Sequence, residues 1–317
     1  TERLMELIAG DIGGTKSWLV WMRDGAVTPR FEKVYSSADF ASGEALLARF
    51  IEEAGQSAHP DTLTLALPGP LAARRVSLTN LDWTLDADAL GSALDLPRVQ
   101  FVNDFQAQAA GVATLGADDV LTLNAAPAVP SGVRAITGAG TGLGLAFMTA
   151  GDDGQYLSHA TEAGHADFAP ANALQGRLLD HLRQRYGHVS REMGISLNGL
   201  CAVWEALSLI DGVPVPQAEA VQVVAQARAG DRRAREAVGM VTDWLAAMAS
   251  DIALIMGARG GIYLTGALLD LLDDLFDAER FCRGYVNKGG LTEYVSEIPV
   301  FRTTARQMEI TGLATLF

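Results

Sequence analysis

The chain has 317 residues, of which 49% are apolar and only 20% are charged, so it can bury a sizeable core instead of remaining disordered. At this length one or two domains are expected. A formal net charge of -14 and a pI near 4.7 argue against nucleic acid and against anionic membranes as partners. An anionic ligand would need a local pocket of backbone N–H groups, metal and a few cations.

The cysteines and the N-terminal residues indicate the compartment. Cys201 and Cys282 lie far apart and form no Cys-x-x-Cys pair, so neither a disulfide framework nor a thiolate metal site is expected. The first apolar stretch is interrupted by Arg3 and Glu6 and stops at Asp11, which is too short and too charged for a signal peptide or a membrane span. We therefore expect a cytoplasmic protein with reduced thiols and no membrane partner.

Short apolar runs between turn signals predict strands in the first hundred residues, and helical spacing appears once among them. The expected strands are 4–9, 18–22, 62–67 and 99–102, and the expected helix is 44–54.

A second block begins near residue 104, with expected strands at 120–123, 133–137 and 143–149, and a mostly helical half follows. Leucines repeat every four residues within 171–186, which predicts a helix with one apolar stripe. Asp231 is a candidate N-cap for a helix reaching about residue 258. Its apolar second half, 244–258, reads as buried although it contains Asp251. A strand at 262–265 and a helix at 268–276 follow, and this mixture predicts an α/β protein.

Two glycine-rich loops stand between apolar β runs, at 10–16 (GDIGGTK) and 137–144 (TGAGTGLG). Neither fits the dinucleotide fingerprint G-x-G-x-x-G, and the first lacks the spacing of G-x-x-x-x-G-K, which disfavours Rossmann and P-loop enzymes. For the first loop, an ordinary hairpin with a capping Asp is the alternative. Together the loops suggest one phosphate loop from each of two related domains, because glycine lets backbone N–H groups approach a phosphate closely.

Polar side chains follow an apolar strand in Phe101-Val102-Asn103-Asp104-Phe105. A carboxylate at such a strand end could accept a hydroxyl proton while the hydroxyl oxygen attacks phosphorus. The structural alternative is that Asp104 only caps the next helix.

Acids and an imidazole gather in residues 161–168 (TEAGHADF), and Glu192 follows in 188–192 (HVSRE). These groups suit the adjacent hydroxyls of a sugar ring, although each could also be a satisfied or solvated structural residue. His159 and His165 lack the further ligands that zinc requires.

Taken in order, these segments resemble the bacterial glucokinase family of the hexokinase, actin and Hsp70 superfamily. The motifs that carry the resemblance are GDIGGTK at 10–16, TNLDW at 79–83, FVNDF at 101–105, GAGTGLG at 138–144, EAGHADFAP at 162–170 and HVSRE at 188–192. The resemblance implies a two-domain actin-like ATPase (ribonuclease H-like) α/β fold with a central cleft. The expected small domain is 1–107 plus 303–317, and the expected large domain is 108–302.

The resemblance also implies an ATP-dependent kinase for the 6-hydroxyl of glucose, with ATP and Mg²⁺ as cofactors and Asp104 as the catalytic base. Sugar-binding residues are then Asn103, Asp104, Glu162, His165 and Glu192. Nucleotide-binding residues are Gly10, Asp11, Gly13, Gly14, Thr15, Lys16, Gly138, Gly140, Thr141, Gly142 and Gly266, and Asp11 is expected near the metal.

Three departures from the family pattern stand out. The C-terminal residues 307–313 (QMEITGL) lack the usual glycine-rich ending. Ala267 replaces a second glycine after the late strand, and Ser196-Leu197-Asn198-Gly199-Leu200 replaces the usual Ser-Gly-Pro-Gly-Leu. The sequence leaves two alternative functions open: a kinase for another hexose or for an amino sugar, and a non-catalytic sugar sensor. It also leaves open whether the protein forms a homodimer.

Overall fold

The computed structural model describes residues 5–23, 28–55, 59–69, 71, 74–78, 81–214 and 217–316, and the chain folds into two compact units. The first unit contains Thr1–Leu115, Tyr156–Ala160 and Ala305–Phe317. The second contains Gly116–Gln155 and Thr161–Thr304. The sequence predicted a small domain of 1–107 plus 303–317 and a large domain of 108–302, and these domain boundaries stay a prediction.

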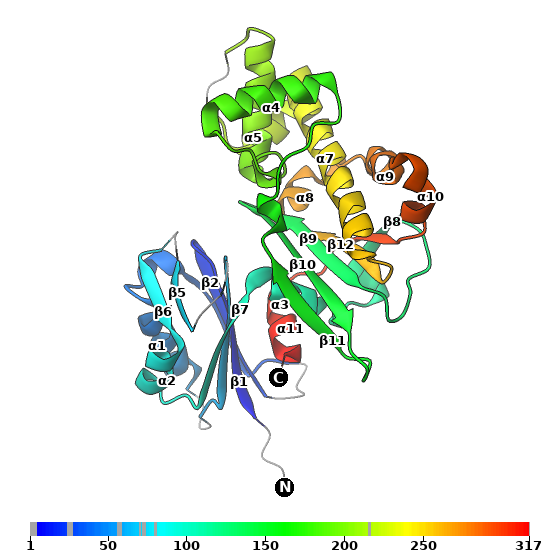
Figure 1. The fold of residues 1–317 in the computed structure, drawn as a ribbon. Helices are drawn as coiled ribbons and strands as arrows, with labels where there is room; N and C mark the ends of the chain where they lie inside the picture. Colours follow the sequence, from blue (N-terminus) through cyan, green and yellow to red (C-terminus); the bar gives the residue numbers. More distant parts are fainter. Residues whose placement is uncertain are drawn as a thin grey trace. The chain divides into compact units, whose positions relative to one another are not determined.

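A five-stranded mixed sheet forms the centre of the first unit, in the order β3-β2-β1-β4-β7 (Figure 1). β1 pairs with β2, and β2 with β3, in antiparallel fashion, whereas β1–β4 and β4–β7 are parallel. A separate hairpin joins β5 to β6. The strands are β1 (Glu6–Ile12), β2 (Lys16–Arg23), β3 (Phe31–Ser36), β4 (Thr62–Leu67), β5 (Arg75–Leu78), β6 (Trp83–Asp86) and β7 (Arg98–Asn103).

Helices cover both faces of this sheet, and this is why β4 is buried along its whole length (Figure 1). Alternate residues point to opposite faces, so Ile8 joins the core beneath α1 and α2 while Ala9 joins the core beneath α3 and α11. The helices are α1 (Gly43–Ala54), α2 (Ala87–Ala93), α3 (Asp104–Gly111) and α11 (Met308–Thr315), with 3-10 turns η1 (Ser37–Asp39) and η2 (Val112–Thr114).

The last helix packs closely against α3, because glycines bring the two backbones together. A Cβ at Gly111 would meet the carbonyl oxygen of Met308, and one at Gly312 would meet the carbonyl oxygen of Ala107. The C-terminal segment therefore belongs to the same unit as the first strands.

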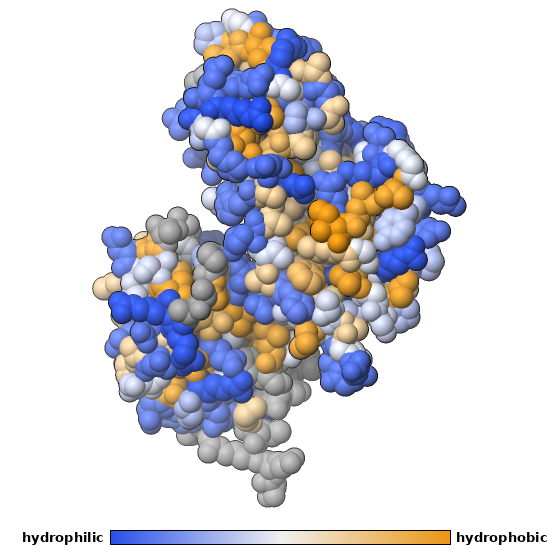
Figure 2. Space-filling model, in the orientation of Figure 1, coloured by the Kyte–Doolittle hydropathy of each residue, from blue (hydrophilic) through white to orange (hydrophobic). Residues whose placement is uncertain are grey.

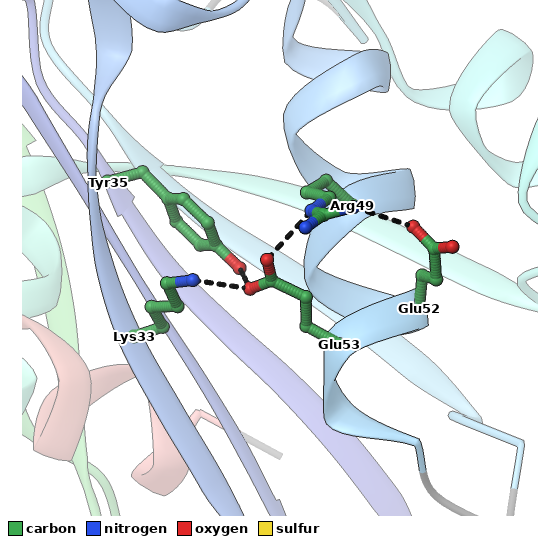
Figure 3. Close-up of polar contacts among 5 residues, drawn as sticks. All are labelled: Lys33, Tyr35, Arg49, Glu52 and Glu53. Atoms are coloured by element: carbon green, nitrogen blue, oxygen red, sulfur yellow. Dashed lines mark hydrogen bonds and ion pairs between the residues drawn. The ribbon is translucent and has the colours of Figure 1, made fainter.

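A polar cluster joins β3 to α1 at the surface of the first unit (Figure 3). Glu53 accepts hydrogen bonds from Lys33 Nζ at 2.6 Å, from the Tyr35 hydroxyl at 2.8 Å and from Arg49 Nε at 2.7 Å. Arg49 also donates to Glu52 at 3.2 Å. The hydrogen bond from Lys33, followed by that from Tyr35, lowers the pKa of Glu53 to about 2.

A six-stranded sheet has the order β11-β10-β9-β12-β13-β8. Strands β8, β9, β10, β12 and β13 form the base of the second unit, whereas Tyr156–Ala160 of the edge strand β11 are assigned to the first unit. β9 pairs with β10 as an antiparallel hairpin, β12 lies parallel to β9 and to β13, and β8 is antiparallel to β13. The strands are β8 (Val120–Asn124), β9 (Arg134–Ala139), β10 (Leu143–Ala150), β11 (Tyr156–Thr161), β12 (Gly261–Thr265) and β13 (Val300–Thr303).

Helices pack against this sheet and against one another around the long helix α7. They are α4 (Ala173–Tyr186), α5 (Leu197–Ile210), α6 (Ala220–Arg228), α7 (Arg232–Met256), α8 (Ala267–Leu272), α9 (Ala278–Val286) and α10 (Thr292–Ser296). The 3-10 turns are η3 (Ala117–Asp119), η4 (Ala163–His165), η5 (Arg191–Met193), η6 (Asp273–Leu275) and η7 (Gly289–Leu291).

Helix α7 is a core helix. Within the described part of the chain it is the helix long and apolar enough to span a membrane by composition, but 72% of its apolar window is buried inside the protein. Asp231 caps it by accepting a hydrogen bond from the Ala234 N–H at 2.7 Å, as predicted. It ends at Met256, earlier than the predicted 258, because Gly257 adopts a left-handed φ of +57°.

The predicted apolar stripe of α4 is confirmed at its leucines, whereas Tyr186 at its end is 42% exposed. Leu178, Leu179 and Leu182 are buried, whereas Arg177 and Asp180 are exposed. Hydrophilic residues accordingly predominate in Figure 2 where Figure 1 places α4. The predicted helix 268–276 is shorter, since α8 stops at Leu272 and a 3-10 turn follows.

Candidate functional site

The first glycine loop is a fixed hairpin with an exposed tip. It joins β1 to β2, and the Gly13 N–H donates to the carbonyl of Lys16 at 3.0 Å. Ser37 holds the loop from η1, since its hydroxyl donates to the Gly13 carbonyl at 2.7 Å and its N–H to the Thr15 carbonyl at 3.0 Å. Thr15 and Lys16 are exposed, so the tip can meet a ligand without rearranging the strands.

Gly10 differs from the other glycines of this motif because it lies inside β1. A Cβ there would stand 2.5 Å from Leu19 Cδ2 and 2.8 Å from Leu65 Cδ2. The packing of the sheet therefore accounts for this glycine, and its expected part in nucleotide binding stays a prediction.

Three carboxyl groups interact at one end of the first unit. Asp11 is partly buried, and burial, with smaller contributions from the charges of Glu309 and Asp104, raises its pKa to about 7. Burial also raises the pKa of Glu309, whose carboxylate accepts a hydrogen bond from Gln108 Nε2 at 2.7 Å. Sequence reasoning missed Glu309 because nothing in its local motif marks it. The excess of negative charge here would be relieved by a cation.

Asn103 and Asp104, at the end of β7 and the start of α3, make different hydrogen bonds. Asn103, only 6% exposed, is the N-cap of α3: its Oδ1 accepts from the Gln106 N–H at 3.1 Å, and its Nδ2 donates to the Gly69 carbonyl at 3.1 Å. The capping role weighed for Asp104 thus belongs to Asn103. Asp104 is the first residue of α3, where its Oδ1 accepts from the Phe105 N–H at 2.8 Å. A carboxylate is favoured at this helix end by the helix dipole.

The second glycine loop joins β9 to β10 in the second unit, and glycine is required at its positions for different physical reasons. A Cβ at Gly138 would lie 2.8 Å from the Thr265 carbonyl oxygen, and Gly266, with φ +105°, lies against the backbone of Ala139. A Cβ at Gly140 would meet nothing within 4 Å. Packing therefore explains Gly138 and Gly266, whereas open space at Gly140 is what close approach of a ligand requires.

Glu192 connects the second loop to the motifs that follow it. Its Oε2 accepts a hydrogen bond from the Leu143 N–H at 2.9 Å, and a Cβ at Gly142 would lie 2.7 Å from the same oxygen. Gly164 lies directly against the Leu143 carbonyl oxygen. Three motifs that are separate in sequence, 138–144, 162–170 and 188–192, thus pack together.

Backbone hydrogen bonds reinforce this packing. The Phe168 N–H donates to the Val189 carbonyl at 3.1 Å, the Arg191 N–H to the Ala166 carbonyl at 2.9 Å and the Leu197 N–H to the Gly140 carbonyl at 2.8 Å.

Glu162 and His165 lie at the surface of the second unit, at the start and the end of η4: Glu162 is its N-cap and His165 its last residue. Their side chains are 46% and 61% exposed, and His165 Nε2 lies 4.0 Å from Glu162 Oε2. Of the expected sugar residues, Asn103 and Asp104 belong to the first unit and Glu162, His165 and Glu192 to the second.

A cavity of about 900 Å³ opens beside the second loop, within the second unit. Its volume is in the range of small-molecule sites. It includes Thr141, Glu192 and Ala267, and the departures from the family pattern at 196–199 also lie on its wall. Sequence reasoning missed most of its lining, which comes chiefly from the end of α4, from α5, from α6 and from the segment before α6. It includes Arg185, Tyr186, Cys201, Trp204, Gln217, Glu219 and Val221.

Other expected features are limited in what they supply. Thr79 and Asn80 of the TNLDW motif lie outside the described residues. Cys201 and Cys282 are free thiols, and burial raises the pKa of both. Within the described ranges, no group of three or more His, Cys, Asp or Glu side chains is arranged to hold a metal ion.

Comparison with known proteins gives a consistent result. Residues 8–317 match the glucokinase family model. A glucokinase of Pseudomonas paraeruginosa is 33% identical over 309 residues, which cover 96% of this chain and 90% of that protein. The crystal structure of a glucokinase from an Antarctic psychrotroph is 26% identical, has a TM-score of 0.88 and covers 99% of both chains.

A more distant structure shares the fold. A ROK family glucokinase from Streptomyces griseus, solved in complex with glucose and AMPPNP, is 18% identical with a TM-score of 0.62 over 98% of both chains. These similarities confirm the predicted α/β two-domain fold. Because the family model and the Pseudomonas relative both cover nearly the whole chain, the chain belongs to the glucokinase family.

Proposed function

We propose that this protein is a glucokinase that transfers the terminal phosphoryl group of ATP to the 6-hydroxyl of glucose. The observation that carries the proposal is the family match over residues 8–317, within which Asp104 stands at the start of α3. The protein from Streptomyces griseus binds glucose and AMPPNP, and we extend those two ligand classes, glucose and an adenine nucleotide, to this chain. A cytoplasmic location is part of the proposal.

Asp104 acts as the general base. Its carboxylate takes the proton of the glucose 6-hydroxyl while the hydroxyl oxygen forms a bond to the γ-phosphorus and the bond from that phosphorus to the bridging oxygen of ADP breaks. Asn103, Glu162, His165 and Glu192 bind the sugar hydroxyls. Their amide, imidazole and carboxylate groups suit a neutral polyol, and an anionic sugar would be repelled.

The nucleotide is held by the two loops. In the second unit, the open space at Gly140 admits phosphate, and the adjoining cavity of about 900 Å³ has room for the adenosine. In the first unit, Gly14, Thr15 and Lys16 present backbone N–H groups, and Lys16 one ammonium, to the phosphates. Gly13 closes the hairpin beneath them, because its N–H donates to the Lys16 carbonyl. These local groups overcome the repulsion from a net charge of -14.

Asp11 would hold the Mg²⁺ that accompanies ATP. Its pKa is raised to about 7 by burial and by Glu309 and Asp104, so its position favours a cation beside it, and carboxylate oxygen is a preferred ligand of Mg²⁺. When bound, the ion would neutralise charge on the ATP phosphates during transfer of the terminal phosphoryl group.

A coupled assay with a panel of acceptors tests the proposed substrate. Glucose should be the preferred acceptor, and an epimer that misplaces one hydroxyl should lose about tenfold or more in kcat/KM, because buried polar groups are then left unpaired. Equal rates with galactose, mannose and N-acetylglucosamine would overturn the assignment to glucose.

A further inference from the structure

Among the carboxylates of helix α7, that of Asp251 contacts Arg191, the residue before Glu192. Asp251 Oδ2 accepts a hydrogen bond from Arg191 Nη2 at 2.9 Å, and its Oδ1 accepts one from Lys288 Nζ at 2.6 Å. The three side chains are 30%, 20% and 23% exposed, respectively. Both carboxylate oxygens are therefore used, in surroundings that exclude much of the solvent.

The position of this acid is unusual for its helix. From Trp244 to Met256 it is the charged residue in an otherwise uncharged run of α7, most of which is buried in the core. A carboxylate held there is costly unless cations pair with it, and removing one member leaves the others unpaired. Arg191 and Lys288 supply the two cations that compensate this carboxylate.

Arg191 is held by hydrogen bonds through its backbone as well as through its side chain. Its N–H donates to the Ala166 carbonyl at 2.9 Å, and its carbonyl accepts from the Gly194 and Ile195 N–H groups at 3.0 and 2.9 Å. With its guanidinium also bound to Asp251, Arg191 is fixed at both ends. Glu192 follows directly in the same 3-10 turn.

A second contact from α7 supports the same turn. Trp244 lies seven residues before Asp251 and therefore on the same helix face. Its ring packs edge-on against Phe168 at 4.6 Å, and a Cβ at Gly194 would lie 3.0 Å from it. The turn that carries Glu192 is thus held by α7 through an aromatic contact and an ion pair.

We propose that Asp251 is a positioning residue for sugar binding: through Arg191 it fixes the direction of Glu192. This inference rests on the proposed contact between Glu192 and the sugar. The Leu143 N–H fixes one carboxylate oxygen of Glu192, and the Asp251–Arg191 pair fixes the backbone from which that side chain extends.

The test begins with Asp251→Asn, which keeps the shape and removes the charge. The dissociation constant for glucose, measured by calorimetry, and the KM for glucose should each rise about tenfold, while kcat changes less than about twofold, as for loss of an interaction equally strong in the ground and transition states. Unchanged glucose affinity in a folded variant would overturn the proposal.

The matched control is Asp243→Asn on the same helix. Asp243 makes a comparable ion pair, with both oxygens bound by Arg280 at 2.7 Å and a side-chain exposure of 32%. This variant should lose stability without changing glucose affinity. An equal rise in the glucose dissociation constant would show that any lost ion pair on α7 has this effect, and would overturn the proposal.

A second variant guards against misfolding of the first. Arg191→Met breaks the same contact and leaves Asp251 paired with Lys288, so it should weaken glucose binding to a similar extent. Unaltered glucose affinity in Arg191→Met would count against the proposal as directly as the same result for Asp251→Asn.

A double-mutant cycle with Glu192→Gln distinguishes the role of Asp251 from the sugar contact of Glu192. If Asp251 acts through Glu192, Asp251→Asn should add less than about twofold to the glucose dissociation constant of Glu192→Gln, because coupled residues are not additive. If the effects of the two substitutions on the glucose dissociation constant are fully additive, the role of Asp251 is overturned and the sugar contact of Glu192 is not. No effect of Glu192→Gln by itself would overturn both the sugar contact of Glu192 and the inference built on it.

Discussion

The Leu143 backbone N–H donates a hydrogen bond to Glu192 Oε2 at 2.9 Å, so an acid expected to bind sugar is fastened to the loop expected to bind phosphate. The contact joins residues 49 positions apart in sequence. One carboxylate oxygen thus contributes to the shape of the loop, and both substrates should be sensitive to this side chain.

Replacing Glu192 in two ways should separate these roles. Glu192→Gln keeps an oxygen that can accept from Leu143, so the KM for ATP should change less than about twofold while glucose binding weakens. Glu192→Ala loses the hydrogen bond as well, and the KM for ATP should rise about 3- to 10-fold. Steady-state kinetics with each substrate varied will measure this, and an ATP KM that is the same in both variants would remove the link between Glu192 and the loop.

Gly140→Val should weaken ATP binding far more than glucose binding. An added Cβ meets no protein atom within 4 Å, so the fold should survive, but the branched group would keep phosphate from the backbone. The control is Gly138→Ala, whose Cβ would stand 2.8 Å from the Thr265 carbonyl oxygen and should lower the melting temperature instead. Calorimetric titration of Gly140→Val with both ligands decides, since an equal loss of the two affinities would indicate a purely structural loop.

Asp11→Asn should impair catalysis without lowering stability. Because burial raises the pKa of Asp11 to about 7, its charged form is held at a cost in the folded chain, and a neutral amide avoids that cost. In metal-free buffer at pH 8, the melting temperature of the variant should equal or exceed that of the unaltered protein. In a separate Mg²⁺ titration of the kinase rate, the Mg²⁺ concentration for half-maximal rate should rise. A lowered melting temperature with unchanged Mg²⁺ dependence would mean that Asp11 is structural.

Glu53→Gln should remove a pH-dependent part of the stability of the first unit. The folded pKa of Glu53, about 2, lies below its ordinary value of 4.5, so its contribution is present above pH 4.5 and is lost as pH falls towards 2 (Figure 3). Denaturant unfolding of both proteins at several pH values should give a difference that fades across this interval. Glu44→Gln, in the first turn of the same helix, is the control, and a difference for Glu53→Gln that does not vary with pH would contradict the assignment.

Local patterns in the sequence predicted the parts of the structure that depend on neighbouring residues. Strand 62–67 is β4 itself, and Asp231 caps α7 as expected, because alternation and capping act over a few residues. Both glycine loops are hairpins between the predicted strands. The exception is Asp104, where the cap proved to be Asn103, since the helix begins one residue earlier than a cap at Asp104 would require.

Contacts between distant segments could not be predicted in this way. Glu309 raises the pKa of Asp11 only because α11 packs beside β1, and Asp251 meets Arg191 across 60 positions. The cavity beside Thr141 is likewise assembled from several helices. A single sequence marks none of these pairs, because each depends on how the chain returns to the same unit.

Formation of glucose 6-phosphate by the unaltered chain and by Asp104→Asn, measured side by side, tests the central claim most directly. The unaltered protein should form glucose 6-phosphate and ADP in equal amounts. The amide keeps the shape of Asp104 but cannot take the proton, so Asp104→Asn should still bind glucose while its rate falls by about 10² to 10⁴. ADP released without glucose 6-phosphate, or near-normal turnover by Asp104→Asn, would contradict the account.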